Sequence, residues 1–158
     1  MILIRKGTEK DIPALLKLIK ELAHYEKEPD EVVVTEKQLL QDGFGSDKIF
    51  DFFVATDIGK VIGIALYYTK FSTWKGKCIY LEDIIVSKEM RGQGIGKKLF
   101  NEVIKISKAK KVKRMEWQVL EWNEPAVEFY KKYNAELDPT WLNGELNYEK
   151  LQQFNEFE

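Results

Sequence analysis

Apolar residues in the first part of the chain recur at helical spacing. The positions are Ile12, Leu15, Leu16, Ile19, Leu22 and Ala23. This three-and-four spacing predicts an amphipathic helix. Thr8 and Asp11 precede it as a capping box with Asp in place of Glu, and we expect the helix to end near Tyr25 and Glu26, ahead of Pro29. Thr35 is placed to cap a second helix that carries Leu39 and Leu40 and ends at Gly43 or Gly45.

Runs rich in β-branched and aromatic residues predict the strands. The runs are Ile2–Arg5, Phe50–Ala55, Lys60–Thr69 and Ile79–Val86. Asp57, Ile58 and Gly59 form a hairpin turn between the second and third runs, and Trp74, Lys75 and Gly76 form the turn before the fourth.

The remainder predicts a helix over Lys97–Lys110, a strand over Lys113–Leu120, a helix over Glu124–Tyr133 and a last strand near Leu146–Leu151. The order is then β-α-α-β-β-β-α-β-α-β, in which hairpins are combined with one βαβ crossover. That order predicts a single α+β domain spanning residues 1–158 and built on a mixed central sheet flanked by helices.

A glycine-dense stretch from Arg91 to Gly96 lies between the apolar run that ends at Val86 and the helix that follows. A strand that leads through such a loop into a helix aims free backbone N–H groups and the positive end of the helix dipole at one point, which suits a pyrophosphate. The spacing of Gly92, Gly94 and Gly96 differs from that of a dinucleotide-binding fingerprint. It also differs from a P-loop, because Lys97 is followed by Lys98 where a P-loop has Ser or Thr. The alternative is a glycine-rich turn that binds nothing.

Composition limits the class of protein. With 158 residues, 44% hydrophobic and 32% charged, the chain is expected to be a soluble single domain. A net charge of −1 argues against a nucleic-acid binder, although nine Lys and Arg against the single acid Glu102 lie between Arg91 and Arg114. That basic stretch is either a solvated helix face or the rim of a site for a phosphorylated ligand.

Cysteine and histidine are too few for several kinds of site. Cys78 is the only cysteine and His24 the only histidine, which excludes an intramolecular disulfide and a zinc site of ordinary spacing. No apolar stretch is long enough for a membrane span or resembles the core of a signal peptide. We therefore expect a cytoplasmic protein without metal, nucleic-acid or membrane partners.

Two adjacent acids, Glu82 and Asp83, interrupt the apolar strand Ile79–Val86. Buried carboxylates are costly unless they are compensated, and neighbours in a strand are expected to point to opposite faces. A carboxylate with apolar neighbours and a second acid nearby has a raised pKa, which suits a proton acceptor. The alternative is that backbone or Lys partners satisfy both acids.

Several motifs in order resemble one enzyme family. Arg91, Gly94 and Gly96 resemble the acetyl-CoA pyrophosphate loop of the GNAT acetyltransferase superfamily. The chain also resembles the diamine (spermidine/spermine) acetyltransferase branch of this superfamily in five segments, namely Ile19–Glu26, Leu39–Gly45, Tyr80–Asp83, Glu121–Pro125 and Phe129–Lys131. The resemblance runs from about residue 3 to residue 135. It implies the GNAT fold, transfer of an acetyl group from acetyl-CoA to a primary amine, no metal, and a homodimer. Because no activated nucleophile is evident in the sequence, we expect direct transfer in a ternary complex.

The resemblance also implies roles for individual residues. Glu82 corresponds to the general base and Tyr130 to the acid that protonates the leaving thiolate. Positions that correspond to acetyl-CoA contacts are Ile84, Ile85, Val86, Arg91, Gly92, Gln93, Gly94, Ile95, Gly96, Lys97, Asn123, Glu124, Pro125 and Ala126. Positions that correspond to contacts with the amine are Tyr25, Glu26, Trp74, Glu82, Asp83, Glu116, Trp117 and Gln118.

Two departures bear on the amine. Ser72 stands where polyamine-specific members have an acid, so that Phe71–Gly76 is more similar to the thialysine-acetylating members. The acidic tract beyond the catalytic helix is shortened to Leu137–Thr140. Thialysine, a lysine analogue or a short diamine is therefore favoured over a long polyamine. The alternatives are a protein N-terminal or lysine acetyltransferase and a non-catalytic acetyl-CoA-binding module.

Overall fold

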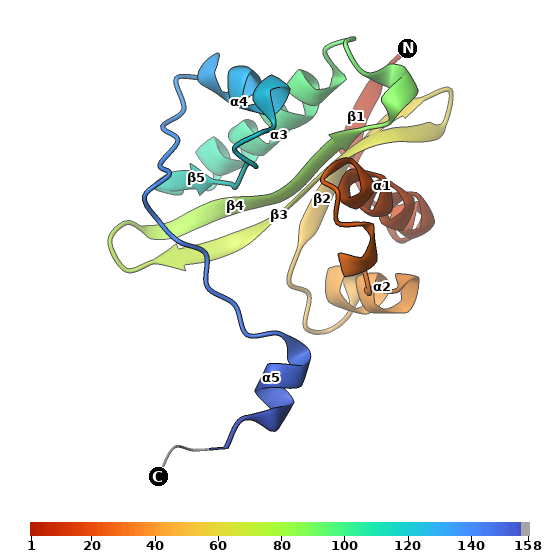
Figure 1. Cartoon of the computed structure of the whole chain (residues 1–158). Helices are drawn as coiled ribbons and strands as arrows, with labels where there is room; N and C mark the ends of the chain where they lie inside the picture. The colour runs from red at the N-terminus through yellow and green to blue at the C-terminus, as the bar shows by residue number, and fades with distance from the viewer. Residues whose placement is uncertain (156–158) are drawn as a thin grey trace. The chain divides into compact units, whose positions relative to one another are not determined.

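The computed structural model describes residues 1–155, which divide into two units, Met1–Leu120 and the part from Glu121 onward. The first unit contains β1 (Leu3–Lys6), α1 (Ile12–Tyr25), α2 (Glu36–Phe44), β2 (Asp51–Asp57), β3 (Lys60–Ser72), β4 (Gly76–Val86), α3 (Ile95–Ala109) and β5 (Arg114–Glu116) (Figure 1). Short 3-10 turns lie at Glu9–Asp11, Pro29–Glu31 and Lys88–Met90. The second unit contains α4 (Glu124–Lys131) and α5 (Tyr148–Gln153).

The five strands form one sheet in the order β1-β2-β3-β4-β5. The first four are antiparallel to their neighbours. β5 returns through α3 and runs parallel to β4, as expected for a crossover connection. This is the mixed sheet that the sequence predicts.

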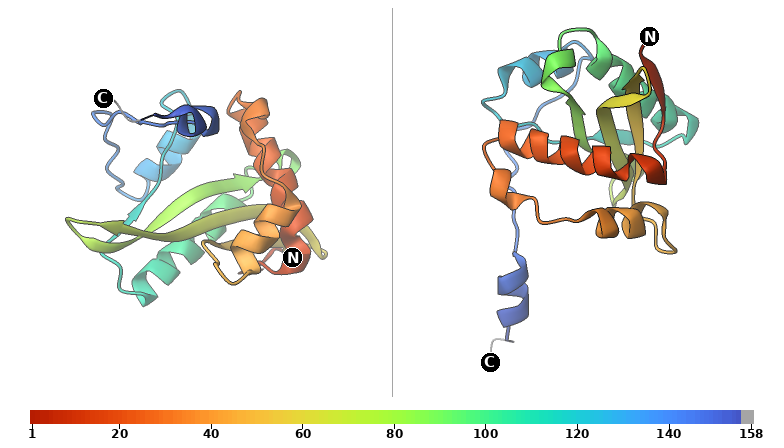
Figure 2. Two further views of the ribbon diagram at one scale, coloured as in Figure 1. Left: turned by 90° about the horizontal axis from the view of Figure 1, so that it is seen from below. Right: turned by 90° about the vertical axis from the view of Figure 1, so that its right-hand side faces the viewer.

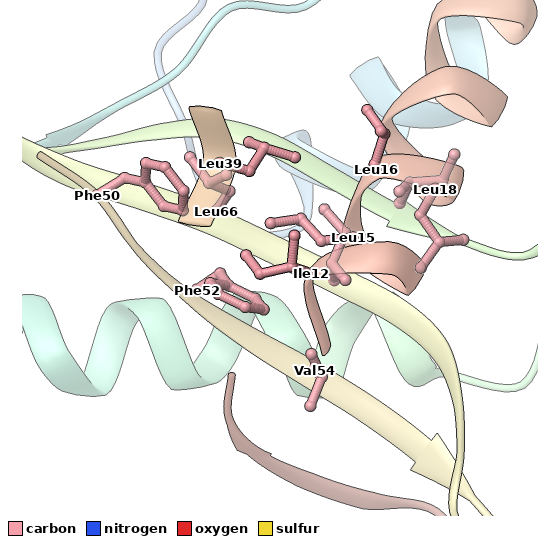
Figure 3. Packing of buried hydrophobic residues seen from close by; sticks show 11 residues of the cluster. Ile12, Leu15, Leu16, Leu18, Leu39, Phe50, Phe52, Val54 and Leu66 are labelled. Atoms are coloured by element: carbon pink, nitrogen blue, oxygen red, sulfur yellow. The ribbon is translucent and has the colours of Figure 1, made fainter. Parts of the chain in front are cut away.

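Helices cover both faces of the sheet (Figure 2). On one face, α1 and α2 bury a cluster that includes Leu15, Leu39 and Phe52 (Figure 3). Ile64 and Ile85 belong to the same cluster. On the other face, α3 contributes residues that are fully buried, namely Ile95, Leu99, Phe100 and Val103. This burial holds the ends of β4 and α1 in place, and both ends contribute to the site below.

Local sequence signals fix the ends of the first two helices. The carboxylate of Asp11 accepts a hydrogen bond from the backbone N–H of Thr8 at 2.8 Å and forms an ion pair with Arg5 at 2.7 Å. The hydroxyl of Thr35 accepts a hydrogen bond from the N–H of Gln38 at 3.2 Å at the start of α2. The capping box predicted at Thr8 and Asp11 is present, and Thr35 caps α2 as predicted. Gln38 completes a second capping box there, and α2 ends ahead of Gly45.

A β-bulge interrupts β4 at Glu82. Leu66 of β3 is opposite Asp83, and the next residue, Tyr67, is opposite Leu81, so Glu82 is the extra residue. A bulge breaks the alternation of side chains along a strand. The expectation that Glu82 and Asp83 point to opposite faces is therefore wrong, because Asp83 shares the face of Leu66 and Glu82 reaches Tyr68 on that same face.

Two predicted strands differ from those observed. The strand predicted over Lys113–Leu120 is confined to Arg114–Glu116. The strand predicted near Leu146–Leu151 is wrong, because the helix α5 occupies this segment and the side chain of Asn147 caps it by accepting from the N–H of Lys150 at 3.0 Å. Among the described residues, no helix is long and apolar enough to cross a membrane.

Candidate active site

Beyond Tyr80, strand β4 has one open edge. Its parallel pairing with β5 covers only Cys78 to Tyr80, because β5 ends at Glu116, and no other described strand pairs with β4 on this side. The N–H of Ser87 donates to the carbonyl of Ile62 on β3 at 2.8 Å. Because backbone groups alternate between the two edges of a strand, those of Ile84 and Val86 point away from β3. The open edge of β4 therefore offers backbone donors and acceptors to an extended ligand.

The glycine loop joins this edge to α3. Gly92 and Gly94 have φ angles of 78° and 74°, and a Cβ atom at either would meet no described atom within 4 Å. Gly94 caps α3, which begins at Ile95, so the first backbone N–H groups of the helix have no partner within the helix. The loop thus has the open space, the donors and the helix dipole that a pyrophosphate requires.

Arg91 braces the start of this loop. Its Nε donates to the carbonyl of Val86 at 2.9 Å, and its guanidinium lies 5.1 Å from the ring centre of Tyr25 at the end of α1. Glu21 of α1 lies 3.4 Å from Arg91 Nη2 and accepts the N–H of Lys88 at 2.9 Å. These contacts tie the loop and the open edge of β4 to the end of α1.

Three carboxylates gather beside the bulge. Burial, followed by the charges of Glu82 and Glu26, raises the pKa of Asp83 to about 7. Burial also raises the pKa of Glu26, the residue that follows α1. Among the described residues, no Lys or Arg forms an ion pair with any of the three. An uncompensated negative cluster attracts a cation by Coulomb's law.

Tyr68 of β3 contacts this cluster directly. Its hydroxyl donates to Glu82 Oε2 at 3.0 Å, and its ring lies 5.4 Å from that of Tyr80 on the same face. Burial, together with the hydrogen bond and the charge of Glu82, raises the pKa of the Tyr68 phenol far above its ordinary value. Tyr68 also lines a groove of about 630 Å³ with Lys48, Ile49, Phe50, Asp51, Leu66 and Thr69.

The predicted amine contacts at the end of β5 and just beyond it do not share one face of the sheet. Glu116 is opposite Tyr80 and forms ion pairs with Lys70 at 3.5 Å and Arg114 at 3.3 Å. Its second oxygen, Oε2, is buried without a hydrogen-bond partner among the described residues. The ring of Trp117 packs edge-on against Phe100 of α3 at 5.3 Å and so belongs to the other face. Gln118 is exposed two residues beyond the end of β5.

Other predicted substrate contacts lie apart from the bulge. Tyr25 is partly exposed beneath the guanidinium of Arg91. Trp74 is 77% exposed in the turn between β3 and β4. It precedes Gly76, the first residue of β4, and Glu82 lies six residues beyond Gly76 along that strand. At ~3.3 Å per residue this is about 20 Å, so the structure does not bring Trp74 to Glu82 within one chain.

The predicted site residues of the second unit lie at the start of α4 and within it. The side chain of Asn123 caps α4 by accepting from the N–H of Ala126 at 3.4 Å, and Pro125 lies in the first turn. Tyr130, later in this helix, is only 5% exposed, and its ring lies 5.3 Å from that of Phe129. The predicted helix start is confirmed.

Sequence reasoning missed Tyr68 and Glu21. Tyr68 lies in an apolar strand where packing is the ordinary role of a tyrosine, and Glu21 occupies a polar position of an amphipathic helix. Neither position carries a local signal, since the partners are 14 and 67 residues away in sequence.

Comparison with known proteins agrees with the geometry. Residues 13–135 match the acetyltransferase (GNAT) family. Thialysine N-epsilon-acetyltransferase of Bos taurus is 41% identical over 143 residues, which are 85% of this chain and 84% of that protein. Spermidine/spermine N(1)-acetyltransferase-like protein 1 of Homo sapiens is 34% identical over 139 residues, which are 84% of this chain and 20% of that protein.

Solved structures share the fold. An integron cassette protein from the mobile metagenome of V. cholerae superposes with a TM-score of 0.78 at 24% identity and covers 96% of each chain. An aminoglycoside acetyltransferase from a soil metagenome gives a TM-score of 0.76 at 21% identity over 92% of this chain and 97% of that one. The family match covers most of the chain and both sets of similarities agree, so the chain belongs to the GNAT family and is an N-acetyltransferase.

Proposed function

We propose that the chain transfers an acetyl group from acetyl-CoA to the primary amine of a small cationic substrate, with thialysine or a similar lysine analogue as the preferred class. The observation that carries this proposal is the cluster of Glu26, Glu82 and Asp83, which lies without a cationic partner among the described residues next to the open edge of β4. A negative cluster recruits an ammonium group, and a carboxylate in it can accept the proton that the amine must lose before it attacks.

The cosubstrate is acetyl-CoA, which GNAT acetyltransferases use. Backbone groups of Ile84 and Val86 would pair with its extended pantetheine arm, with Ile85 between them in the strand. The loop from Arg91 to Lys97 would hold its pyrophosphate, and the side chain of Arg91 would act by bracing that loop. Asn123, Glu124, Pro125 and Ala126 are proposed to contact acetyl-CoA from the start of α4.

Glu82 is the proposed general base. The bulge exposes its carboxylate, and the hydroxyl of Tyr68 holds one oxygen, which leaves Oε1 able to accept a proton from the amine directly or through water. The deprotonated nitrogen then attacks the thioester carbonyl and forms the new C–N bond. A backbone N–H of the open edge of β4 would stabilise the oxyanion that develops.

Tyr130 is the proposed acid. As the intermediate collapses, the C–S bond breaks and the sulfur takes the electron pair, so a proton delivered to sulfur eases departure of the thiol. A phenol is neutral at pH 7 and can donate that proton. No residue in this scheme forms a covalent intermediate, which favours direct transfer within a ternary complex.

The substrate class follows from charge and similarity together. Several relatives are named thialysine N-epsilon-acetyltransferases, and Ser72 replaces the acid of polyamine-specific members. Glu116 carries a buried oxygen without a described partner that could bind a second ammonium group. The groove beside Tyr68 has room for the aliphatic part of a lysine analogue.

The test is steady-state acetylation of thialysine, lysine, putrescine, spermidine and a lysine-containing peptide, with release of CoA monitored. The proposal predicts the highest kcat/KM for thialysine. A preference for the peptide would favour a protein acetyltransferase, and acetyl-CoA binding without turnover of any amine would favour a non-catalytic module.

We further propose a homodimer in the cytoplasm. Phe71 and Trp74 expose 71% and 77% of their surface at the turn between β3 and β4, and aromatic residues are enriched at interfaces. The one cysteine, Cys78, is a buried free thiol, which fits a reducing compartment. Light scattering at micromolar concentration that gives a monomer mass would contradict the dimer.

A further inference from the structure

Tyr68 and Glu82 are joined by a hydrogen bond that exists because of the bulge. In a regular ladder the residue opposite Leu66 would directly follow the residue opposite Tyr67, but here Glu82 is inserted between Leu81 and Asp83. The inserted residue has no position opposite it on β3, so the ladder does not fix its side chain. A separate contact must hold the carboxylate, and the Tyr68 hydroxyl provides it at 3.0 Å.

We propose that Tyr68 is the positioning residue for the general base, and that its hydroxyl both orients the Glu82 carboxylate and stabilises its charged form. This inference rests on the proposed role of Glu82. A hydrogen bond donated to a carboxylate favours the ionised state of that carboxylate. The hydroxyl occupies Oε2, so the free oxygen Oε1 keeps a fixed direction toward the amine.

The ring of Tyr68 is held well enough for this task. It packs on the cluster that includes Leu66 and lies 5.4 Å from the ring of Tyr80, and Lys70 Nζ lies 5.4 Å from the centre of that Tyr80 ring. Tyr80 and Asp83 of β4 interact with Glu82 directly. The charged groups around these two residues are Glu26 beside Asp83, and Glu116 and Lys70 beside Tyr80. Lys70 is paired with Glu116, and the remaining charged groups are acidic. The hydroxyl of Tyr68 therefore donates to Glu82 in surroundings that are mainly negative.

The test is the pH profile of kcat/KM for Tyr68→Phe with thialysine as substrate. Loss of the donor should move the acidic limb to higher pH by about one unit, the size expected for a hydrogen bond to a charged group. Turnover on the plateau should fall by about tenfold. The same comparison in a Glu26→Gln, Asp83→Asn background removes the other two carboxyls of the cluster, so that the limb reports Glu82.

The matched control is Tyr67→Phe. Tyr67 precedes Tyr68 in β3, but its ring stacks on Phe53 at 5.5 Å on the opposite face, and burial raises the pKa of its phenol to about 12. This variant loses the same atom from a more buried site and should leave the limb in place. An unmoved limb in Tyr68→Phe, with only a lower melting temperature, would overturn the inference and make Tyr68 a packing residue.

A second measurement does not depend on the Tyr68 variant folding. The ζ-carbon chemical shift of Tyr68 at neutral pH reports donation by its hydroxyl, so it should differ between the wild type and Glu82→Ala, which removes the acceptor, whereas that of Tyr67 should not. An unchanged Tyr68 shift would overturn the inference. If Glu82→Gln turns over normally, the proposed base is wrong and the inference falls with it. If Glu82→Gln is inactive while the Tyr68→Phe limb is unmoved, only the inference fails.

Discussion

Glu21 of α1 accepts a hydrogen bond from the backbone N–H of Lys88 at 2.9 Å. This contact joins α1, which ends at the carboxylate cluster, to the segment that leads into the glycine loop Arg91–Gly96. The same Glu21 oxygen lies 3.4 Å from Arg91 Nη2, and Arg91 in turn holds the carbonyl of Val86. One acid thus connects the proposed amine side of the site with the proposed acetyl-CoA side.

Removing this acid should weaken acetyl-CoA binding. In Glu21→Ala the N–H of Lys88 loses its acceptor and Arg91 loses its ion-pair partner, at a cost of about 1 kcal/mol. We expect the Kd for acetyl-CoA, measured by calorimetry, to rise by about 3- to 10-fold. Glu102→Ala, which removes an exposed pair with Lys105 on α3, is the control and should leave the Kd unchanged. An unchanged Kd in Glu21→Ala would show that the contacts of Glu21 with Lys88 and Arg91 do not support acetyl-CoA binding.

Gly94→Asp should abolish most acetyl-CoA binding while the fold survives. The substitution places bulk and negative charge in the open space at the start of α3, where the pyrophosphate is proposed to lie. Gly59→Asp is a matched control, because Gly59 has a φ of 77° and open space around its Cβ position as well, in the hairpin between β2 and β3. Both variants should lose similar stability, but only Gly94→Asp should lose binding in calorimetry. Equal affinities in the two variants would exclude the loop as the cradle.

The stability of the protein should depend on pH through Asp83. Its pKa of about 7 in the folded state lies above the ordinary value of ~3.9, so between about pH 4 and pH 7 the folded protein binds a proton that the unfolded chain does not. The contribution of this proton to stability is complete below that window and is lost as the pH rises through 7. Asp83→Asn has no such loss. Its melting temperature relative to wild type should therefore increase from pH 5 to pH 8.

The control for this measurement is Asp47→Asn, which changes an exposed aspartate in the segment between α2 and β2. Its melting temperature should follow that of the wild type across the same range. A difference between Asp83→Asn and wild type that stays constant with pH would mean that Asp83 is ionised throughout the range in the folded protein.

Local signals were sufficient to predict much of the fold. Thr35 and Gln38 form a capping box three residues apart, and Gly59 allows the tight turn after Asp57, so short-range chemistry determines both features. The tail was harder to predict. Leu146 and Tyr148 alternate as in a strand, but Tyr148 and Leu151 have helical spacing, and the cap at Asn147 belongs to a helix.

The candidate site could be predicted only in part. Glu82 and the glycine loop are visible in the sequence because their residue types are unusual in their positions. The bulge is not visible, since it depends on the register between β3 and β4, and neither is the bond from Tyr68. The contact of Trp117 with Phe100 is likewise not visible, since it depends on how α3 packs against the sheet, and the predicted contact of Trp117 with the amine stays a prediction.

Tyr130→Phe should reduce turnover more than binding. The change deletes only the hydroxyl that is proposed to protonate the leaving sulfur, so kcat should fall by about 10²-fold while the KM for the amine changes less. Tyr133→Phe is the control, since Tyr133 is the next aromatic on this segment and its ring lies 5.5 Å from Phe129. Kinetics and melting temperatures of both variants should be compared with wild type. Normal turnover in Tyr130→Phe would mean that the thiolate leaves without this acid.

The central claim is that Glu82 accepts the proton of the amine. Glu82→Gln keeps the size of the side chain and its acceptor for the Tyr68 hydroxyl, but removes its basicity. The most direct test is the rate of single-turnover acetylation of thialysine, assayed at about pH 7.5. The affinity for acetyl-CoA is measured in parallel. The account predicts a loss of about 10²- to 10⁴-fold in the acetylation rate, with acetyl-CoA affinity within about twofold of wild type. A rate close to that of the wild type would contradict it.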